Sequence, residues 1–319
     1  FPGVGTTAEK IAQSINKASD GRLEIKVYGA GEIVPAYEVF DAVRQGTAEM
    51  GHGWSGYWIS KNPGLAYFGG IPGGLSPSEQ SAWALYGGGL ELWEELLDPY
   101  GIQPFQGGIV QTEMFGWYKK ALNSTEDLKG LKIRMSGLAA EVLNRMGATT
   151  VNIPGGEVMS SFQSGVVDAV EWGGPWMDLA FGFPKIAKIC YGPGIHSPGS
   201  NLELLINKDL YKKLPSDLKE IIRVAASNAN TQSYGEFIYR NAISFQIVTN
   251  KHKVEYKILP ESIIKEFLKI SKQVVIENAE KDFAAMKVHK SYQDFLKKSI
   301  DITKFQELGY LNARNLTSN

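Results

Sequence analysis

The sequence predicts an α/β chain of about two domains. Patterns typical of helices and strands alternate through the first half, and many of the 35 glycines fall in clusters between them, such as GGIPGG and YGGGL. Because glycine adopts positive φ at little cost, these clusters favour turns between regular elements. The length of 319 residues is about twice that of an average domain, and one stretch of pattern recurs along the chain.

In the first half, predicted helices have apolar residues on one face and a cap or glycine at an end, and predicted strands alternate apolar with polar residues. The predicted helices cover residues 6–19, 34–46, 77–101 and 136–148, the third being interrupted by glycines. The predicted strands cover residues 21–29, 47–54, 114–120 and 131–135.

The second half is predicted to be mostly helical. Residues 216–250 contain no proline and one glycine, Gly235. This stretch predicts a long helix that either spans both predicted domains or breaks near that glycine. A strand over residues 254–259, an amphipathic helix over residues 260–286 and one more helix after His289 are expected to follow.

The recurring stretch pairs EVFDAVRQGTAEM, from Glu38, with EVMSSFQSGVVDA, which begins 119 positions later at Glu157. Each combines an apolar helix face, a glycine and a short strand that carries an acid. The recurrence is expected either from two similar lobes or from chance, since this unit is common in α/β proteins. Ligands of open α/β sheets bind beyond the carboxyl ends of strands. Two lobes would therefore present HGWSGYW and EWGGPW to one cleft.

Composition excludes several classes of protein and site. Hydrophobic residues make up 43% and charged residues 21%, as in a globular protein with a core, and the net charge of −1 favours neither nucleic acid nor an anionic membrane surface. The lone cysteine, Cys190, excludes an intramolecular disulfide and a multi-cysteine metal site. No apolar run reaches the roughly 20 residues that cross a bilayer. The chain begins without methionine or a signal peptide, so we expect a processed or trimmed start.

The sequence lacks the common signatures of catalysis. It contains no G-x-S-x-G, H-E-x-x-H, Walker or Rossmann motif, and Cys190 has no recognisable partner. The four histidines, His52, His196, His252 and His289, are scattered singly. A lone histidine is more often structural than catalytic, so we interpret these four as structural.

Three charged residues are candidates for binding. Arg134 ends an alternating strand just before the small-residue turn SGLAA, so it either faces solvent or holds a carboxylate with its two-pronged guanidinium. Glu113 and Glu171 lie in apolar, aromatic stretches, where a carboxylate is costly to bury without a cation. These two acids are expected either to pair with lysines or to bind Na⁺ or Ca²⁺ together with backbone carbonyls.

Longer stretches resemble one protein family. GRLEIKVYGAGEIVPAYEVFDAVRQGTAEMGHG, STEDLKGLKIRMSGLAAEVL and QSGVVDAVEWGGP are similar to the periplasmic solute-binding proteins of tripartite ATP-independent periplasmic (TRAP) transporters. The resemblance covers nearly the whole chain and points to the branch that binds 2-oxo and 2-hydroxy monocarboxylates with a metal ion. Family members usually open with a strand just before the residue that begins this chain.

The resemblance implies site residues. Arg134 matches the arginine that grips the substrate carboxylate, Glu171 a metal-binding acid, and Trp172 the residue whose carbonyl binds the metal. Glu113 stands where 2-oxo acid binders carry glutamine, and its extra charge should favour Ca²⁺, with Na⁺ as the alternative. Tyr57 is expected to contact the substrate. The remaining tryptophans of the two cleft segments are expected to form walls: Trp54, Trp58 and Trp176.

The resemblance also implies a fold, a function and partners. We expect a two-lobed periplasmic binding protein with a hinge, its lobes formed by residues 1–108 with 202–245 and by residues 109–201 with 246–319. It should capture an acid such as pyruvate, lactate or a branched 2-oxo acid and deliver it to the small and large membrane subunits of a transporter. A homodimer through the C-terminal helices is one expected assembly. The alternatives are another anion (a sulfonate or a dicarboxylate), a periplasmic enzyme that uses Glu113 or Glu171 as a base, and a sensor domain.

Overall fold

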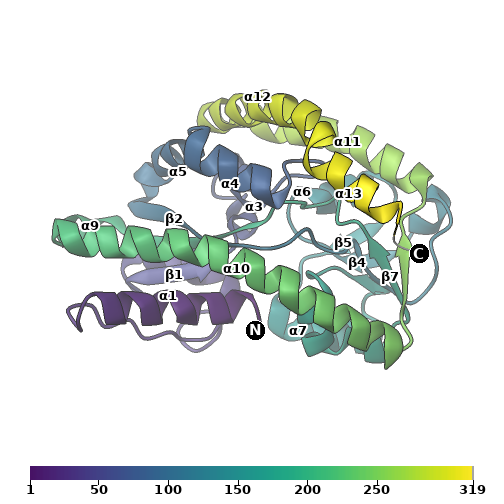
Figure 1. The fold of residues 1–319 in the computed structure, drawn as a ribbon, viewed down its shortest axis with the longest axis horizontal. Coiled ribbons are helices and arrows are strands. Elements are labelled where there is room, and N and C mark those ends of the chain that lie inside the picture. Colours follow the sequence, from purple (N-terminus) through teal and green to yellow (C-terminus); the bar gives the residue numbers. More distant parts are fainter. Residues whose placement is uncertain (318–319) are drawn as a thin grey trace.

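The computed structural model describes residues 1–317 and contains two β-sheets joined by a long helix (Figure 1). The first sheet is antiparallel, in the order β1 (Met50–Gly53), β8 (Asn201–Asn207), β2 (Ile102–Ile109). The second sheet is mixed, and its order is β5 (Thr149–Val151), β4 (Lys132–Arg134), β6 (Ala169–Val170), β3 (Gly116–Tyr118), β7 (Ile189–Gly192), β9 (Glu255–Ile258). We call the part of the molecule around the first sheet the first lobe and the part around the second sheet the second lobe.

Helices surround both sheets. Those of the first half are α1 (Val4–Ala18), α2 (Val39–Gln45), α3 (Ala66–Gly69), α4 (Pro77–Tyr86), α5 (Gly89–Leu97), α6 (Leu138–Arg145) and α7 (Gly155–Ser164). Those of the second half are α8 (Pro175–Phe181), α9 (Lys208–Lys213), α10 (Ser216–Asn250), α11 (Glu261–Ala279), α12 (Phe283–Phe305) and α13 (Glu307–Asn315). Among the described residues, no helix has both the length and the apolar character needed to cross a bilayer.

The predicted long helix is confirmed, and it does not break at Gly235. Helix α10 runs without interruption through 35 residues. It packs on α1 and β2 of the first lobe and on α8 of the second, and Figure 1 shows it crossing the whole molecule. Its buried residues include alanines, serines and asparagines, which let it lie close to both lobes.

Among the described residues, the chain passes between the lobes at four places: residues 110–115 between β2 and β3, residues 193–200 between β7 and β8, α10 itself, and residues 280–282 between α11 and α12. The predicted lobe boundaries stay a prediction. The C-terminal helices pack on both lobes. Helix α11 packs on α6 of the second lobe, whereas Val288 and Tyr292 of α12 lie in the core of the first lobe with Trp83 and Phe68.

The predicted strand over residues 21–29 is wrong. These residues form no strand, although Leu23 and Ile25 pack beside the apolar cluster of α1 and α10. A hollow of about 900 Å³ lies between residues 23–34 and the strands β1 and β8. Alternating side chains make a strand only where a neighbouring backbone supplies hydrogen bonds, and no described strand lies next to this segment.

Candidate ligand and metal site

A small cavity of about 70 Å³ lies where the two lobes and their connections meet. One side is polar and is formed by Arg134, Glu171, Glu113 and His196, with serines around them. The other side is apolar and is lined by four aliphatic residues and one tryptophan: Val4, Val110, Met177, Leu202 and Trp172. Such a lining suits a small molecule with a charged end and an apolar end.

The sheet of the second lobe places Arg134 and Glu171 together. Strands β4 and β6 are parallel neighbours, with Arg134 opposite Val170, so Glu171 follows directly at the carboxyl end of β6. Nη1 of Arg134 donates to the main-chain carbonyl of Glu171 at 2.6 Å and to its carboxylate at 2.9 Å. Its Cζ lies 4.9 Å from the ring centre of Trp172. The solvent-facing interpretation of Arg134 is excluded, because the residue is only 3% exposed.

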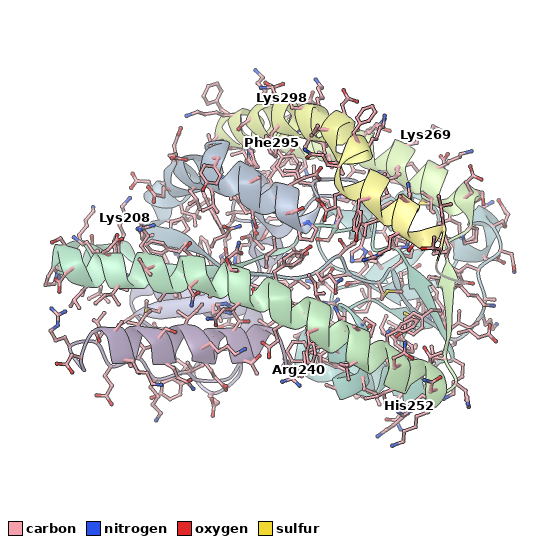
Figure 2. All side chains as sticks on the ribbon, in the orientation of Figure 1. Lys208, Arg240, His252, Lys269, Phe295 and Lys298 are labelled. Carbon is pink, nitrogen blue, oxygen red and sulfur yellow. The ribbon has the colours of Figure 1, made fainter. Side chains whose placement is uncertain are left out.

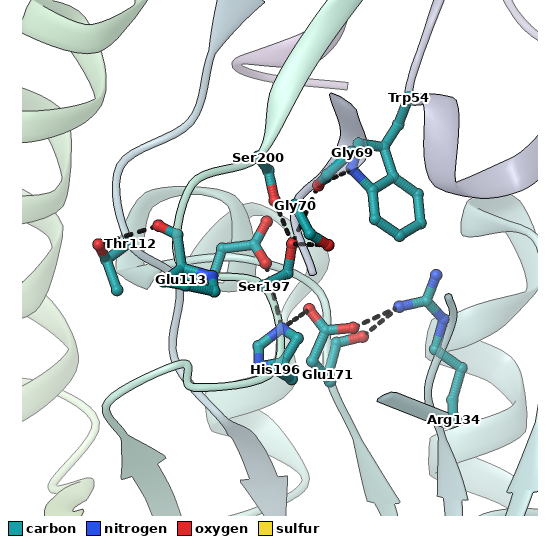
Figure 3. A network of polar contacts seen from close by, with 11 residues as sticks. Trp54, Gly69, Gly70, Thr112, Glu113, Arg134, Glu171, His196, Ser197 and Ser200 are labelled. Carbon is teal, nitrogen blue, oxygen red and sulfur yellow. Dashed lines mark hydrogen bonds and ion pairs between the residues drawn. The ribbon is translucent and has the colours of Figure 1, made fainter. Parts of the chain in front are cut away.

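The two backbone connections place Glu113 beside His196. The amide of Gly194 donates to the main-chain carbonyl of Glu113 at 2.8 Å, and a Cβ at Gly194 would lie 2.4 Å from that same oxygen. Only glycine fits this approach. Two residues on, Nε2 of His196 lies 3.1 Å from the Glu113 carboxylate and 3.3 Å from that of Glu171, as Figure 3 shows.

Sequence reasoning missed His196 as a site residue. It is separated from Glu113 by 83 positions, and its side chain is 3% exposed. The only signal was its place in the glycine- and proline-rich stretch YGPGIHSPGS, which follows a strand. A single histidine in such a loop carries little information until the fold supplies its neighbours.

Serines link the histidine loop to the first lobe. Ser197 donates to the carbonyl of Gly69 at 3.1 Å and is hydrogen-bonded to Ser200 at 2.7 Å. The indole of Trp54 donates to the same Gly69 carbonyl at 2.8 Å. In Figure 3 this chain of contacts lies beside the carboxylates and fixes Trp54 at the cavity.

The predicted aromatic residues divide into two groups. Trp54, Tyr57 and Trp172 line the cavity. Trp58 does not line it, because its indole is buried and donates to Glu203 in the core of the first lobe. Trp176 also lies outside the lining, where it packs against Phe237 of α10.

Burial and mutual charge set the protonation of the cluster. Burial raises the pKa of Glu113 to about 7, although the hydrogen bond with His196 opposes the shift. For His196, burial lowers the pKa, but the carboxylates of Glu171 and Glu113 outweigh it and raise the pKa to about 9. Burial likewise works against ionised Glu171, yet His196 and Arg134 hold the pKa of its carboxyl below the usual value.

The donor set fits a metal ion. Glu113, Glu171 and His196 each offer one ligand atom, and these atoms lie within 4.8 Å of one another. The carboxylates suit hard cations such as Ca²⁺, and imidazole suits borderline divalent metals. Trp172 follows Glu171 in the chain, so its backbone also lies at this cluster.

Comparisons with known proteins match the chain along nearly its whole length. The sequence profile described as "Bacterial extracellular solute-binding protein, family 7" matches residues 3–282. A protein of Nostoc sp. described as a monocarboxylate 2-oxoacid-binding periplasmic protein is 36% identical over 314 residues, which are 98% of this chain and 84% of the relative.

Three solved TRAP solute-binding proteins share the fold. The one from Colwellia psychrerythraea, with bound calcium and pyruvate, is 36% identical, with a TM-score of 0.94 over 98% of this chain and 95% of its own. The one from Pseudoalteromonas atlantica, with bound sodium and pyruvate, is 35% identical, with the same TM-score and coverage. The one from Bordetella bronchiseptica, a mixed-occupancy dimer with calcium and picolinate, is 28% identical, with a TM-score of 0.96 over 99% of this chain and 94% of its own.

Proposed function

We propose that this chain, which belongs to the bacterial extracellular solute-binding proteins of family 7, captures a small 2-oxo or 2-hydroxy monocarboxylate such as pyruvate. The observation that carries the proposal is the amphipathic cavity, with Arg134 and two carboxylates on one side and aliphatic residues on the other. A volume of about 70 Å³ holds roughly five water molecules. That is room for an acid of a few carbon atoms.

In the proposed complex, Arg134 grips the ligand carboxylate. Its guanidinium is held in place by Glu171, Trp172 and the carbonyl of Ile153. A planar guanidinium fixed in this way is well suited to a carboxylate, because its parallel N–H groups match the two oxygens.

Glu113, Glu171 and the carbonyl of Trp172 would hold the metal ion. When bound, the ion would supply positive charge to the carboxylate and the 2-oxygen of the ligand. Two carboxylates and one anionic ligand bring about three negative charges, of which Arg134 offsets one, and the metal would take the place of the proton that His196 shares with the two carboxylates. The balance favours a divalent ion, so we propose Ca²⁺ rather than Na⁺; both ions occur with pyruvate in the similar structures.

The chain is a periplasmic receptor of a TRAP transporter rather than an enzyme, as its family is. The prediction of a receptor rather than an enzyme is thereby confirmed. We propose that binding closes the lobes by a hinge motion of the connections between them and that the small and large membrane subunits recognise the closed form. The hinge would lie in residues 110–115 and 193–200, where the backbone passes from one sheet to the other.

We also propose a homodimer through the C-terminal helices. Helix α13 has no buried residue, and the exposed apolar side chains on it or beside it include Phe305, Leu308 and Tyr310. The Bordetella protein was described as a dimer. Light scattering after size-exclusion chromatography should give twice the chain mass, and Phe305→Lys with Leu308→Lys should give the single mass. Leu210→Lys on α9 is the control. A single mass for the unaltered chain at high concentration contradicts the dimer.

Isothermal titration calorimetry tests the ligand proposal. Pyruvate, lactate, a branched 2-oxo acid, malonate and a small sulfonate would be titrated into the protein with Ca²⁺, with Na⁺ and with chelator. We expect pyruvate to bind with metal and at least tenfold more weakly in chelator. Glu171→Ala should lose both metal and acid, whereas Glu113→Gln should move the preference toward Na⁺. Preferred binding of malonate or the sulfonate, or equal pyruvate affinity in chelator, contradicts the proposal.

A further inference from the structure

We propose that Tyr37 is a latch between the lobes: its hydroxyl bonds the first lobe to Asn152 of the second lobe and holds the receptor closed over its ligand. The inference rests on the proposed function, because it assigns a stabilising residue to the closed form of that receptor. Tyr37 is not among the residues that line the small cavity, so its role is separate from the grip on the ligand.

The two ends of the latch stand on different lobes. Tyr37 lies in the short 3₁₀ helix η1 (Ala36–Glu38), directly before α2, which packs on β1 and β8 of the first sheet. Asn152 directly follows β5 of the second sheet. The Tyr37 hydroxyl donates to Oδ1 of Asn152 at 3.0 Å. This bond therefore joins the lobes through side chains alone.

The second lobe holds Asn152 in position to accept the bond. Strands β4 and β5 are parallel neighbours with Arg134 opposite Val151, so Ser136 and Asn152 follow at the same edge of the sheet. The Ser136 hydroxyl donates to the same Oδ1 at 2.9 Å. An amide oxygen has two lone pairs, so it accepts both bonds. Because Ser136 also lines the cavity, the latch is connected to the ligand site by one hydrogen bond.

The first lobe holds the ring of Tyr37. The centre of this ring lies 4.9 Å from that of Tyr57, in an edge contact. Tyr57 lines the cavity and makes a similar edge contact with Trp54. Tyr37 is thus the outer end of a row of three aromatic rings that begins at the cavity. A ring packed in this way loses little further side-chain freedom when its hydroxyl meets a partner.

The latch lies on the side of the cavity away from the connection that carries Glu113. Burial raises the pKa of Tyr37, while the Arg134 guanidinium and the Ser136 hydroxyl oppose the shift, so the phenol lies near both groups and stays protonated at neutral pH. In Figure 3, Arg134 lies on one side of Glu171 and Glu113 on the other. A bond on the Arg134 side must break when the lobes part, whereas contacts at the connections can persist.

The latch stabilises the closed form with or without ligand, because it contains only protein atoms. A ligand enclosed between two lobes leaves only after they open, so a more stable closed form releases it more slowly. The Tyr37–Asn152 bond is exposed, and water competes for both partners. Its loss should therefore change the balance of closed and open forms about two- to fivefold, the lower part of the range for protein hydrogen bonds.

Stopped-flow tryptophan fluorescence measures the effect on release. Trp54 and Trp172 line the cavity, so binding of pyruvate with Ca²⁺ should change their emission. Tyr37→Phe should raise the dissociation rate constant of pyruvate about two- to fivefold and leave the association rate constant unchanged, because the open form still admits the ligand. The matched control is Tyr100→Phe, which removes a hydroxyl that donates to the Lys61 carbonyl within the first lobe. It should keep the wild-type rates.

A double-mutant cycle separates the latch from a direct contact between Tyr37 and the ligand. Asn152→Ala should raise the dissociation rate constant at least as much as Tyr37→Phe does. The protein with both changes should release pyruvate as fast as Asn152→Ala alone, because the two changes remove the same bond. Effects of the two changes that multiply in the double variant overturn the inference.

Distances between the lobes test the latch without any organic acid. Spin labels at Glu9→Cys on α1 and at His252→Cys, which Figure 2 shows at the far end of α10, report the separation of the lobes. Cys190 is buried and should not take a label. Double electron–electron resonance should show a closed-to-open ratio that falls about two- to fivefold in Tyr37→Phe and is kept in Tyr100→Phe. Circular dichroism of each variant checks that it is folded.

The outcomes separate this inference from the proposed function. The same distance distribution in the wild type and in Tyr37→Phe overturns the inference, whether or not pyruvate binds. A lower closed-to-open ratio in Tyr37→Phe together with no binding of any monocarboxylate supports the latch and overturns the proposed function. Unchanged release of pyruvate from folded Tyr37→Phe overturns the latch, while the binding itself still supports the proposed function.

Discussion

Arg134 donates from a single nitrogen, Nη1, to both the main-chain carbonyl and the carboxylate of Glu171, at 2.6 and 2.9 Å. Both side chains are at least 94% buried. The arginine that we propose to grip the ligand is therefore also the partner of a buried acid, so it contributes to stability as well as to binding.

The first prediction concerns this pair. Arg134→Ala should weaken pyruvate binding by roughly 2–5 kcal/mol, because a charge-assisted contact in a closed site is lost. It should also lower the free energy of unfolding, because Glu171 stays buried with His196 as its remaining charged partner. Calorimetry and chemical denaturation measure the two effects. Arg223→Ala, at an exposed position on α10, is the control. Unchanged affinity in a folded Arg134→Ala protein would remove Arg134 from the site.

A second prediction concerns Glu203, which accepts hydrogen bonds from Ser55 and Trp58 in the core of the first lobe. Burial raises the pKa of its carboxyl from 4.5 to about 7, despite these two hydrogen bonds. The folded state thus holds a proton that the unfolded chain releases. Its contribution to stability is complete below pH 4.5 and is lost as the pH rises to about 7, a change of about 3 kcal/mol.

Glu203→Gln should flatten this part of the pH profile. Denaturation between pH 4 and pH 8 should show a smaller fall in the free energy of unfolding than in the wild type. Glu91→Gln, an exposed position on α5, is the control and should keep the wild-type slope. Parallel profiles for wild type and Glu203→Gln would mean that the pKa of Glu203 does not differ between the folded and the unfolded state.

The third prediction compares two glycines. Gly194→Ala should destabilise the fold and weaken metal binding, because the new Cβ would lie 2.4 Å from the carbonyl of Glu113 and push the two connections apart. Gly235→Ala is the matched change in open space on α10, and it should raise the free energy of unfolding by about 0.5–1 kcal/mol. Thermal denaturation and metal titration of both variants check the pair. Equal, small effects at the two positions would contradict the close approach at Gly194.

The fourth prediction concerns lobe closure. Small-angle X-ray scattering should give a smaller radius of gyration with pyruvate and metal than in chelator, because hinge motion brings the two sheets together. Malonate with metal is the control, and it should give the same radius of gyration as the protein in chelator. A profile that does not change at saturating pyruvate would contradict closure on binding.

The sequence by itself predicted much of the fold and part of the site. A 35-residue stretch without proline predicted α10, since nothing local interrupts a helix there. The apolar stretches around Glu113 and Glu171 identified these two acids, because a buried carboxylate is costly without a cation. The end of a strand just before a small-residue turn identified Arg134. The resemblance to a known family added the expected roles, and these stay predictions.

Tertiary structure decided the rest, because it depends on neighbours that are distant in sequence. Trp54 and Trp58 are both aromatic and four positions apart, yet Trp54 lines the cavity and Trp58 turns to Glu203 in the core. The alternating segment 21–29 has a strand pattern, but no strand among the described residues pairs with it to supply a ladder. His196 carries no signal alone. Its place beside two carboxylates exists only because a glycine lets two connections between the lobes touch.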